Sequence, residues 1–204
     1  MTAPHRSADL RQRLVSAGLD ELRENGLAAV SIRAVARRTG VSHAAPGYVF
    51  GDRAGLLTSM AERGFELLRD HLVASSAGAG GEEAVIAVGA AYLEFARQQP
   101  ALYQLLFDAD ELRRDDPGLA TAGAEAFGAL IDRLPPAVAA TAPRGAGPLL
   151  AWAVVHGLAG LERSGALGAG FADDSERAHA EHALLRHVAP AISAQGEAPS
   201  PASA

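Results

Sequence analysis

The sequence of 204 residues contains no cysteine and no lysine. Without cysteine there is no disulfide scaffold, thiolate zinc site, cysteine nucleophile or thiolate-held iron–sulfur cluster. Aromatic residues make up only 5% of the chain. The sequence contains no run of about 18 apolar residues, the length that a membrane-spanning helix needs. The first residues lack the apolar core of a signal peptide. These absences predict a soluble, cytoplasmic protein without a membrane partner.

Charge is distributed unevenly along the chain. Residues 1–53 carry eight arginines against five acidic residues, a balance of +3, and residues 54–204 carry ten arginines against nineteen, a balance of −9. A basic N-terminal segment followed by a larger acidic segment is compatible with anion binding by the N-terminal region. The composition is otherwise that of a globular protein, with 49% hydrophobic and 21% charged residues.

Apolar residues recur at spacings of three and four, and no segment alternates as a strand does, so the sequence predicts an all-α fold. Ser31 and Ser42 are suited to cap helix starts, and Gly26 and Gly40 are suited to helix ends. The tail 194–204 is expected to be disordered. The expected helices cover approximately 7–25, 32–39, 43–50, 53–75, 82–99, 101–107, 118–134, 149–164 and 175–192.

Two short helices joined by a turn at Gly40 and preceded by a longer helix are the arrangement of a helix-turn-helix that reads DNA. Ala36 is small where the short helices would cross. The core between them would be formed by Ile32, Val35 and Val41. A second helix of two turns fits a major groove about 12 Å wide. The alternative from spacing alone is a helical hairpin without a DNA-binding role.

Residues 14–57, LVSAGLDELRENGLAAVSIRAVARRTGVSHAAPGYVFGDRAGLL, resemble the TetR-type transcriptional regulators. Residues 151–162, AWAVVHGLAGLE, and 90–107, AAYLEFARQQPALYQLLF, are similar to the subgroup with a Trp, His and Gly signature. The resemblance implies a three-helix DNA-binding domain over 1–53 and a helical effector-binding and dimerisation domain over 54–193. It further implies a homodimer, typically a repressor, that a small-molecule effector releases from a palindromic double-stranded DNA operator.

The second short helix departs from the family pattern. Gly47 and Val49 stand where the family has Tyr and His, and Tyr48 is displaced by one position, whereas Phe50 and Arg53 fit. Glycine weakens a helix by about 1 kcal/mol relative to alanine. The departure motivates an alternative function, a dimeric small-molecule-binding protein that reads no specific DNA.

The candidate DNA contacts lie on and around the two short helices. A base edge or thymine methyl could be read by His43, Ala44 and Tyr48. The alternatives are an exposed cap residue for His43 and a core aromatic for Tyr48. Ser31 could serve either as a helix cap or as a phosphate contact. The other expected phosphate contacts are Arg33, Ser42 and Arg53.

The C-terminal part offers a candidate effector pocket and a candidate dimer interface. Trp152 and His156 share a helix face, either as a pocket wall with a polar anchor or as core packing with His156 bonded to a neighbouring carbonyl. The candidate pocket residues are Tyr92, Phe95, Tyr103, Phe107, Phe127, Trp152 and His156. By family resemblance, the last two helices would form a four-helix interface through Trp152, Leu161, Ala178, Leu184, Leu185 and Val188.

Enzyme, metal and cofactor chemistry find little support in the sequence. There is no nucleophile elbow, phosphate-binding glycine loop or HExxH motif. His179 and His182 share a helix face, but an isolated pair of histidines does not predict a metal site. The charged stretch 108–116, DADELRRDD, is expected to be a solvated loop. We therefore predict a protein that is not an enzyme and that needs no metal or cofactor.

Overall fold

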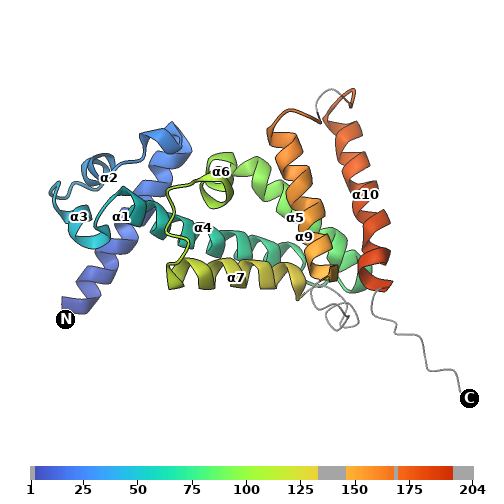
Figure 1. Cartoon of the computed structure of the whole chain (residues 1–204), viewed down its shortest axis with the longest axis horizontal. Coiled ribbons are helices and arrows are strands. Elements are labelled where there is room, and N and C mark those ends of the chain that lie inside the picture. Colours follow the sequence, from blue (N-terminus) through green and yellow to red (C-terminus); the bar gives the residue numbers. More distant parts are fainter. Residues whose placement is uncertain (1–2, 133–145, 168–169, 195–204) are drawn as a thin grey trace, which may run out of the picture. The chain divides into compact units, whose positions relative to one another are not determined.

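The computed structural model of the chain describes residues 3–132, 146–167 and 170–194, in which all regular elements are helices (Figure 1). The predicted all-α class is confirmed. Leu134 and residues 195–204 of the expected tail lie outside the described residues, whereas Ala194, where that tail was expected to begin, ends the last helix. The elements are α1 (Ala3–Asn25), the 3-10 helix η1 (Leu27–Ala29), α2 (Ile32–Thr39), α3 (Ala45–Phe50), α4 (Arg53–Ser75), α5 (Gly81–Gln98), α6 (Pro100–Asp108), α7 (Pro117–Ile131), α9 (Ala146–Arg163) and α10 (Asp174–Ala194).

The chain forms two compact units. The head unit contains residues 1–67 and 99–125, and the body unit contains residues 68–98 and 126–204. Helices α4 and α7 each contribute residues to both units. Compact packing in the head unit therefore extends beyond residue 53, the limit predicted for the DNA-binding domain. That limit concerns function and stays a prediction.

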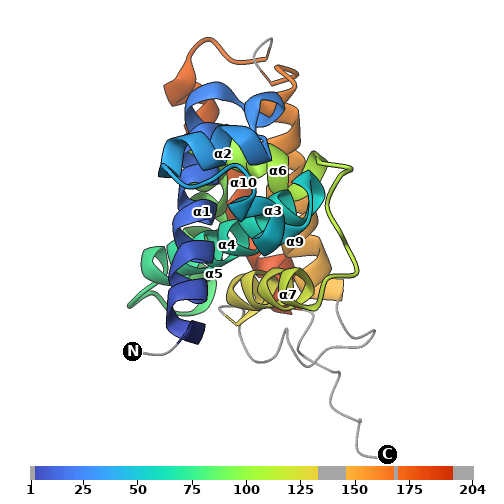
Figure 2. The ribbon, with the colours of Figure 1, turned by 90° about the vertical axis from the view of Figure 1, so that its left-hand side faces the viewer.

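In the head unit, α1 supplies the apolar face on which α2 and α3 rest (Figure 2). Leu14 and Leu22 of α1 and Val35 of α2 are almost completely buried. Gly18 lets α1 approach α4 closely, because a Cβ atom there would lie 2.7 Å from the sulfur of Met60. This packing gives the two short helices a firm support.

In the body unit, α5, α9 and α10 pack against one another, and α9 and α10 run side by side in opposite directions (Figure 1). Gly89 of α5 makes room for α10, because a Cβ atom there would lie 2.9 Å from a methyl group of Leu185. None of the helices in the described ranges combines the length and apolarity needed to cross a membrane.

Candidate functional site

The start of α2 and the turn that follows it have the expected local chemistry. Ser31 has extended backbone angles, and its hydroxyl oxygen accepts a hydrogen bond from the Ala34 N–H at 3.1 Å. This is the N-cap arrangement, so the Ser31 side chain serves the helix. Gly40 ends α2 with a φ of 69°, a left-handed conformation that glycine adopts without strain.

Helix α3 is shorter than predicted. It begins at Ala45, where a start at His43 with a Ser42 cap was expected, and its N-cap residue Ala44 forms no side-chain hydrogen bond. Ser42 instead accepts the Ala45 N–H through its backbone carbonyl at 3.0 Å. Pro46, in the first turn of the helix, needs no hydrogen-bond acceptor there because it has no N–H. The result is a six-residue helix that ends at Phe50.

The candidate base-reading residues are accessible to solvent. His43 and Ala44 are exposed just before α3, and Tyr48 within α3 has 89% of its surface exposed. Tyr48 is therefore not a core aromatic; that role belongs to Phe50, which is 6% exposed. Arg33 on α2 is also exposed, as is Ser42. Figure 2 shows α2 and α3, which carry Arg33 and Tyr48 and between which the other three residues lie.

Arg53 has partners within the chain, where a phosphate contact was expected. Its Nε donates to the Val30 carbonyl at 2.8 Å, and its Nη2 donates to the Leu27 carbonyl at 2.9 Å. Its Nη1 forms an ion pair with Glu111. All three guanidinium nitrogens are thus engaged inside the head unit, which gives Arg53 a structural role.

Arg38 is likewise engaged by α1. Its guanidinium contacts the carboxylates of Glu21 and Glu24, with Nε donating to Glu21 at 3.1 Å and Nη1 to Glu24 at 3.0 Å. The hydrogen bonds from Arg38 hold the pKa of Glu24 below its ordinary value, and the same contacts raise the pKa of Arg38. Arg38 therefore fixes α2 on α1.

The charged stretch 108–116 is the loop that the sequence predicted, and most of its charged side chains are exposed, but two of them also form ion pairs within the head unit. Arg113 pairs with Asp52 at 2.8 Å, and Glu111 pairs with Arg53. Sequence reasoning missed Glu111 and Arg113 because mixed charges between two helices are typical of exposed loops. Their only sequence signal was the density of charge, which does not identify a partner.

The candidate effector residues are only partly brought together. In the body unit, the Tyr92 hydroxyl lies 2.9 Å from Nδ1 of His156, and the rings of His156 and Trp152 are 5.3 Å apart. Phe127 continues this aromatic cluster, with its ring 5.6 Å from that of Trp152. His156 thus has a tyrosine hydroxyl as a hydrogen-bond partner. Its polar pair with Tyr92 suits an anchor in a largely apolar site.

The other three candidate pocket residues pack elsewhere. Phe95 lies beside His71 in the body unit, with ring centroids 6.0 Å apart. Tyr103 and Phe107 belong to the head unit, where Phe107 also packs edge-to-face on Phe65. Helix α6 therefore contributes its aromatic residues to packing inside the head unit.

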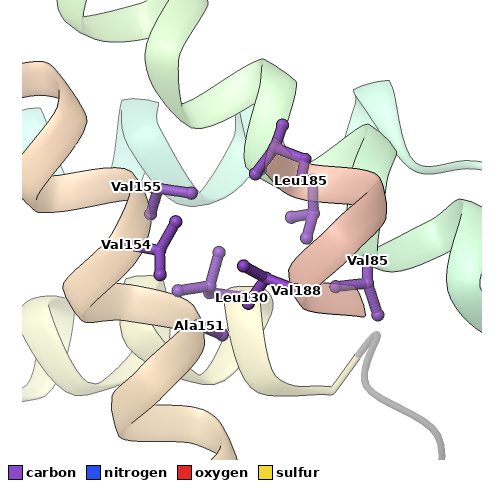
Figure 3. Close-up of a pocket in the computed structure, with 9 residues that line it drawn as sticks. Val85, Leu130, Ala151, Val154, Val155, Leu185 and Val188 are labelled. Carbon is purple, nitrogen blue, oxygen red and sulfur yellow. The ribbon is translucent and has the colours of Figure 1, made fainter. Parts of the chain in front are cut away.

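The body unit also contains a small cavity that the sequence did not predict (Figure 3). Its volume of about 20 Å³ has room for about one water molecule. All the side chains around it are apolar. Nothing in the sequence indicated the cavity, because valines at helical spacing are typical of a packed hydrophobic core. The lining residues are Val85, Val88, Gly89, Leu130, Ala151, Val154, Val155, Leu185 and Val188.

A charge cluster joins α5, α9 and α10. Arg97 donates to Glu162 at 2.7 Å and to Glu181 at 2.5 Å, and Arg177 lies 3.4 Å from Glu162. Glu181 is buried, and its second oxygen lies 3.7 Å from the Nε of Arg177. Burial lowers the pKa of Arg97, but the hydrogen bonds to Glu162 and Glu181 outweigh that effect and the net pKa is raised.

The candidate dimer residues point in two directions. Leu161 is 46% exposed, Leu184 is 38% exposed, and Ala178 is exposed as well. Leu185 and Val188, in contrast, line the small cavity; Leu185 is buried and Val188 is partly buried. Neighbouring positions on a helix are about 100° apart, so Leu184 faces outward while Leu185 fills the space beside Gly89. Trp152 is half-buried in the aromatic cluster.

Comparison with known proteins shows which family the chain resembles. Residues 85–187 match the family described as "Tetracyclin repressor-like, C-terminal domain". A protein of unknown function from Rhodococcus sp. RHA1 is 30% identical, with a TM-score of 0.70, over 88% of this chain and 95% of that one. The chain finds no match among curated proteins.

Two further solved structures share the fold at lower identity. A TetR family transcription regulator from Marinobacter aquaeolei VT8 is 16% identical, with a TM-score of 0.61, over 90% of this chain and 97% of that one. The multidrug binding protein EbrR, solved in complex with imidazole, is 21% identical, with a TM-score of 0.53, over 95% of this chain and 98% of that one.

Proposed function

The chain belongs to the TetR family of transcriptional regulators, and from that membership we propose a homodimeric repressor that a small-molecule effector releases from a palindromic DNA operator. The observation that carries the DNA-binding part is the exposure of Tyr48 on α3, a helix that packs on α1 and α2. A large exposed aromatic side chain beside His43 and Ala44 is suited to base edges and thymine methyl groups in a major groove.

The proposed DNA contacts divide into two kinds. His43, Ala44 and Tyr48 read bases, and exposed Arg33 and Ser42 position the protein on phosphates. Ser31 supports this surface through its helix cap. Two copies of this surface, related by a two-fold axis, require two half-sites in opposite orientation.

We place the effector site in the body unit, at the aromatic cluster of Tyr92, Phe127, Trp152 and His156. The Tyr92–His156 pair supplies a polar anchor, and the half-buried Trp152 and partly exposed Phe127 supply aromatic surface. An effector that binds more tightly to the free protein than to the DNA-bound protein shifts the population toward the free form. Affinity for DNA then falls by that difference.

One observation favours the alternative, a small-molecule-binding protein that reads no specific DNA. Helix α3 has six residues and no side-chain cap, and it contains Gly47. A short helix of this composition has little intrinsic stability. If the alternative holds, the protein will not select a preferred sequence from a pool of random DNA duplexes.

The test begins with selection of duplexes from a random-sequence pool, together with DNA from upstream of the protein's own coding region. We expect saturable binding that weakens with salt, because phosphate contacts release counterions. Tyr48→Ala should reduce affinity for the selected duplex by about tenfold, the effect of losing one good base contact. Fluorescence anisotropy at two salt concentrations measures both effects.

The matched control is Val73→Ala, which shortens another exposed apolar side chain, on α4 in the body unit. Its affinity for DNA should equal that of the wild type. Equal affinity for selected and unrelated duplexes in the wild-type protein would refute the proposed regulator and leave the small-molecule-binding alternative.

A further inference from the structure

The loop between α6 and α7, residues 109–116, contacts the turn that follows α3. Arg113 Nη2 donates to both carboxylate oxygens of Asp52, at 2.8 and 2.9 Å. The backbone N–H of Arg113 donates to the Thr58 hydroxyl at 3.0 Å. Asp52 also accepts the Gly55 N–H at 2.9 Å, at the start of α4. The loop therefore holds the junction at which α3 passes into α4.

Arg53 extends this contact to the segment that leads into α2. Its guanidinium reaches Leu27 and Val30, which lie between α1 and α2, and it reaches Glu111 in the loop. Its side chain is 30% exposed, so these hydrogen bonds are partly shielded from water. A planar guanidinium can serve three acceptors at fixed angles, whereas a lysine ammonium cannot reproduce that geometry.

The loop is itself held in place at both ends. Arg114 donates to the carbonyls of Leu106 at 3.2 Å and Ala109 at 3.3 Å. Asp116 accepts the N–H groups of Gly118 at 2.9 Å and Leu119 at 3.1 Å, which caps α7. Glu111 and Arg113 are thus presented from a firmly attached segment.

We propose that Glu111 and Arg113 form a clamp that sets the position of α3 for DNA reading, with Arg53 as a positioning residue that contacts no phosphate. The inference rests on the DNA-binding function proposed above. Helix α3 has only six residues, far below the roughly 12 that an isolated helix needs to persist in water. Its placement therefore depends on the contacts at its ends, and the clamp supplies those at its C-terminal end.

The test uses the salt dependence of DNA binding, because that slope counts phosphate contacts. The probe is the duplex that the full-length wild-type protein selects from a random-sequence pool. Arg53→Lys keeps the charge and loses the three-acceptor geometry, and Arg53→Gln loses both. We expect both variants to bind at least about tenfold more weakly than wild type, the effect of losing hydrogen bonds to a charged group. The salt slope should equal that of the wild type for both.

A phosphate contact predicts a different pattern. Arg53→Lys would then bind within about threefold of wild type, and Arg53→Gln would reduce the magnitude of the slope by about 0.9. Either result would overturn the positioning role. Arg63→Gln is the matched control for lost positive charge, because Arg63 is exposed on α4 and pairs with nearby Glu66 at 2.7 Å.

Glu111→Gln tests the clamp from the loop side. Its matched control is Asp110→Asn, which removes one negative charge from the neighbouring exposed position. We expect Glu111→Gln to weaken binding about fivefold relative to Asp110→Asn. Tighter binding with a steeper salt slope would mean that Glu111 competes with DNA for Arg53, which contradicts the clamp.

Loss of folding is separated from loss of positioning by the melting temperature of each variant. The Glu111 side chain is more than half exposed, so Glu111→Gln should remain folded. Its DNA affinity therefore tests the clamp even if an Arg53 variant unfolds. The wild-type protein also separates the two proposals. If it selects no duplex, the proposed function fails; if it selects one and the variant pattern differs, only the clamp fails.

Discussion

At the scale of single residues, the head unit uses two glycines for opposite reasons. Gly40 has a φ of 69° and ends α2 in the left-handed conformation that other residues adopt at a cost. Gly47 lies within α3 with an ordinary helical backbone, and a Cβ atom there would meet no other atom within 4 Å. The first glycine is needed for the turn, whereas the second only weakens its helix.

Gly47→Ala should therefore stabilise the head unit by up to about 1 kcal/mol, through higher helix propensity and a less flexible unfolded chain. Gly40→Ala, the same change seven positions earlier, should destabilise it by about 1 kcal/mol. Urea denaturation gives the free energy of unfolding for both. A change of the same sign in the two variants would contradict this assignment.

At the scale of elements, charge as well as apolar contact holds α5, α9 and α10 together. Glu181 of α10 is 7% exposed and lies between Arg97 of α5 and Arg177 of its own helix. Removal of a buried carboxylate leaves its cationic partners without compensation. Because the two arginine side chains are 35% and 23% exposed, water relieves part of that penalty.

Glu181→Gln should accordingly lower the free energy of unfolding of the body unit by about 1–3 kcal/mol. Asp174→Asn is the control, since Asp174 also pairs with Arg177 but its side chain is 90% exposed. Its effect should stay within about 0.5 kcal/mol. Thermal and urea unfolding measure both, and equal losses in the two variants would argue against a special role for Glu181.

At the scale of the whole molecule, we propose that a homodimer forms through the outward faces of α9 and α10. Both helices carry exposed apolar residues, which on α9 recur every four positions, and small side chains permit helices to approach closely. A stable dimer buries about 800 Å² on each partner, more than an isolated leucine supplies. The exposed residues concerned are Leu149, Ala153, Gly157 and Leu161 on α9, and Ala178, Ala183 and Leu184 on α10.

Leu184→Arg should convert the proposed dimer to a monomer, because a two-fold axis would place the new charge on both sides of the interface. Sedimentation velocity measures the association state. Val73→Arg introduces the same charge at another exposed apolar position of the body unit, and it should remain dimeric. A dimer that survives Leu184→Arg would place the interface elsewhere.

Much of the fold could be predicted because its signals are local. The Ser31 cap, the Gly40 turn and the apolar spacing within α1 each act over one or two helical turns. The start of α3 was mispredicted at Ser42, because serine is a good cap in general but the chain forms its turn there through a backbone carbonyl.

Which partner each side chain takes depends on residues far apart in the sequence. Arg33, Arg38 and Arg53 have the same chemistry, yet one is exposed, one is bound by α1 and one is held by Glu111. Tyr103 and Tyr92 were equally good candidates for an effector pocket, but they lie in different compact units. No local pattern distinguishes these outcomes.

The sequence alone thus determined the helical class, the place of the helix-turn-helix and the residue types available to read DNA, since each follows from short-range propensity and spacing. The tertiary structure decided which cations remain exposed, that the charged stretch 108–116 docks onto the α3–α4 junction, and that Leu185 faces inward beside Gly89. Those outcomes depend on packing and charge pairing between distant segments, and the folded chain brings those segments together.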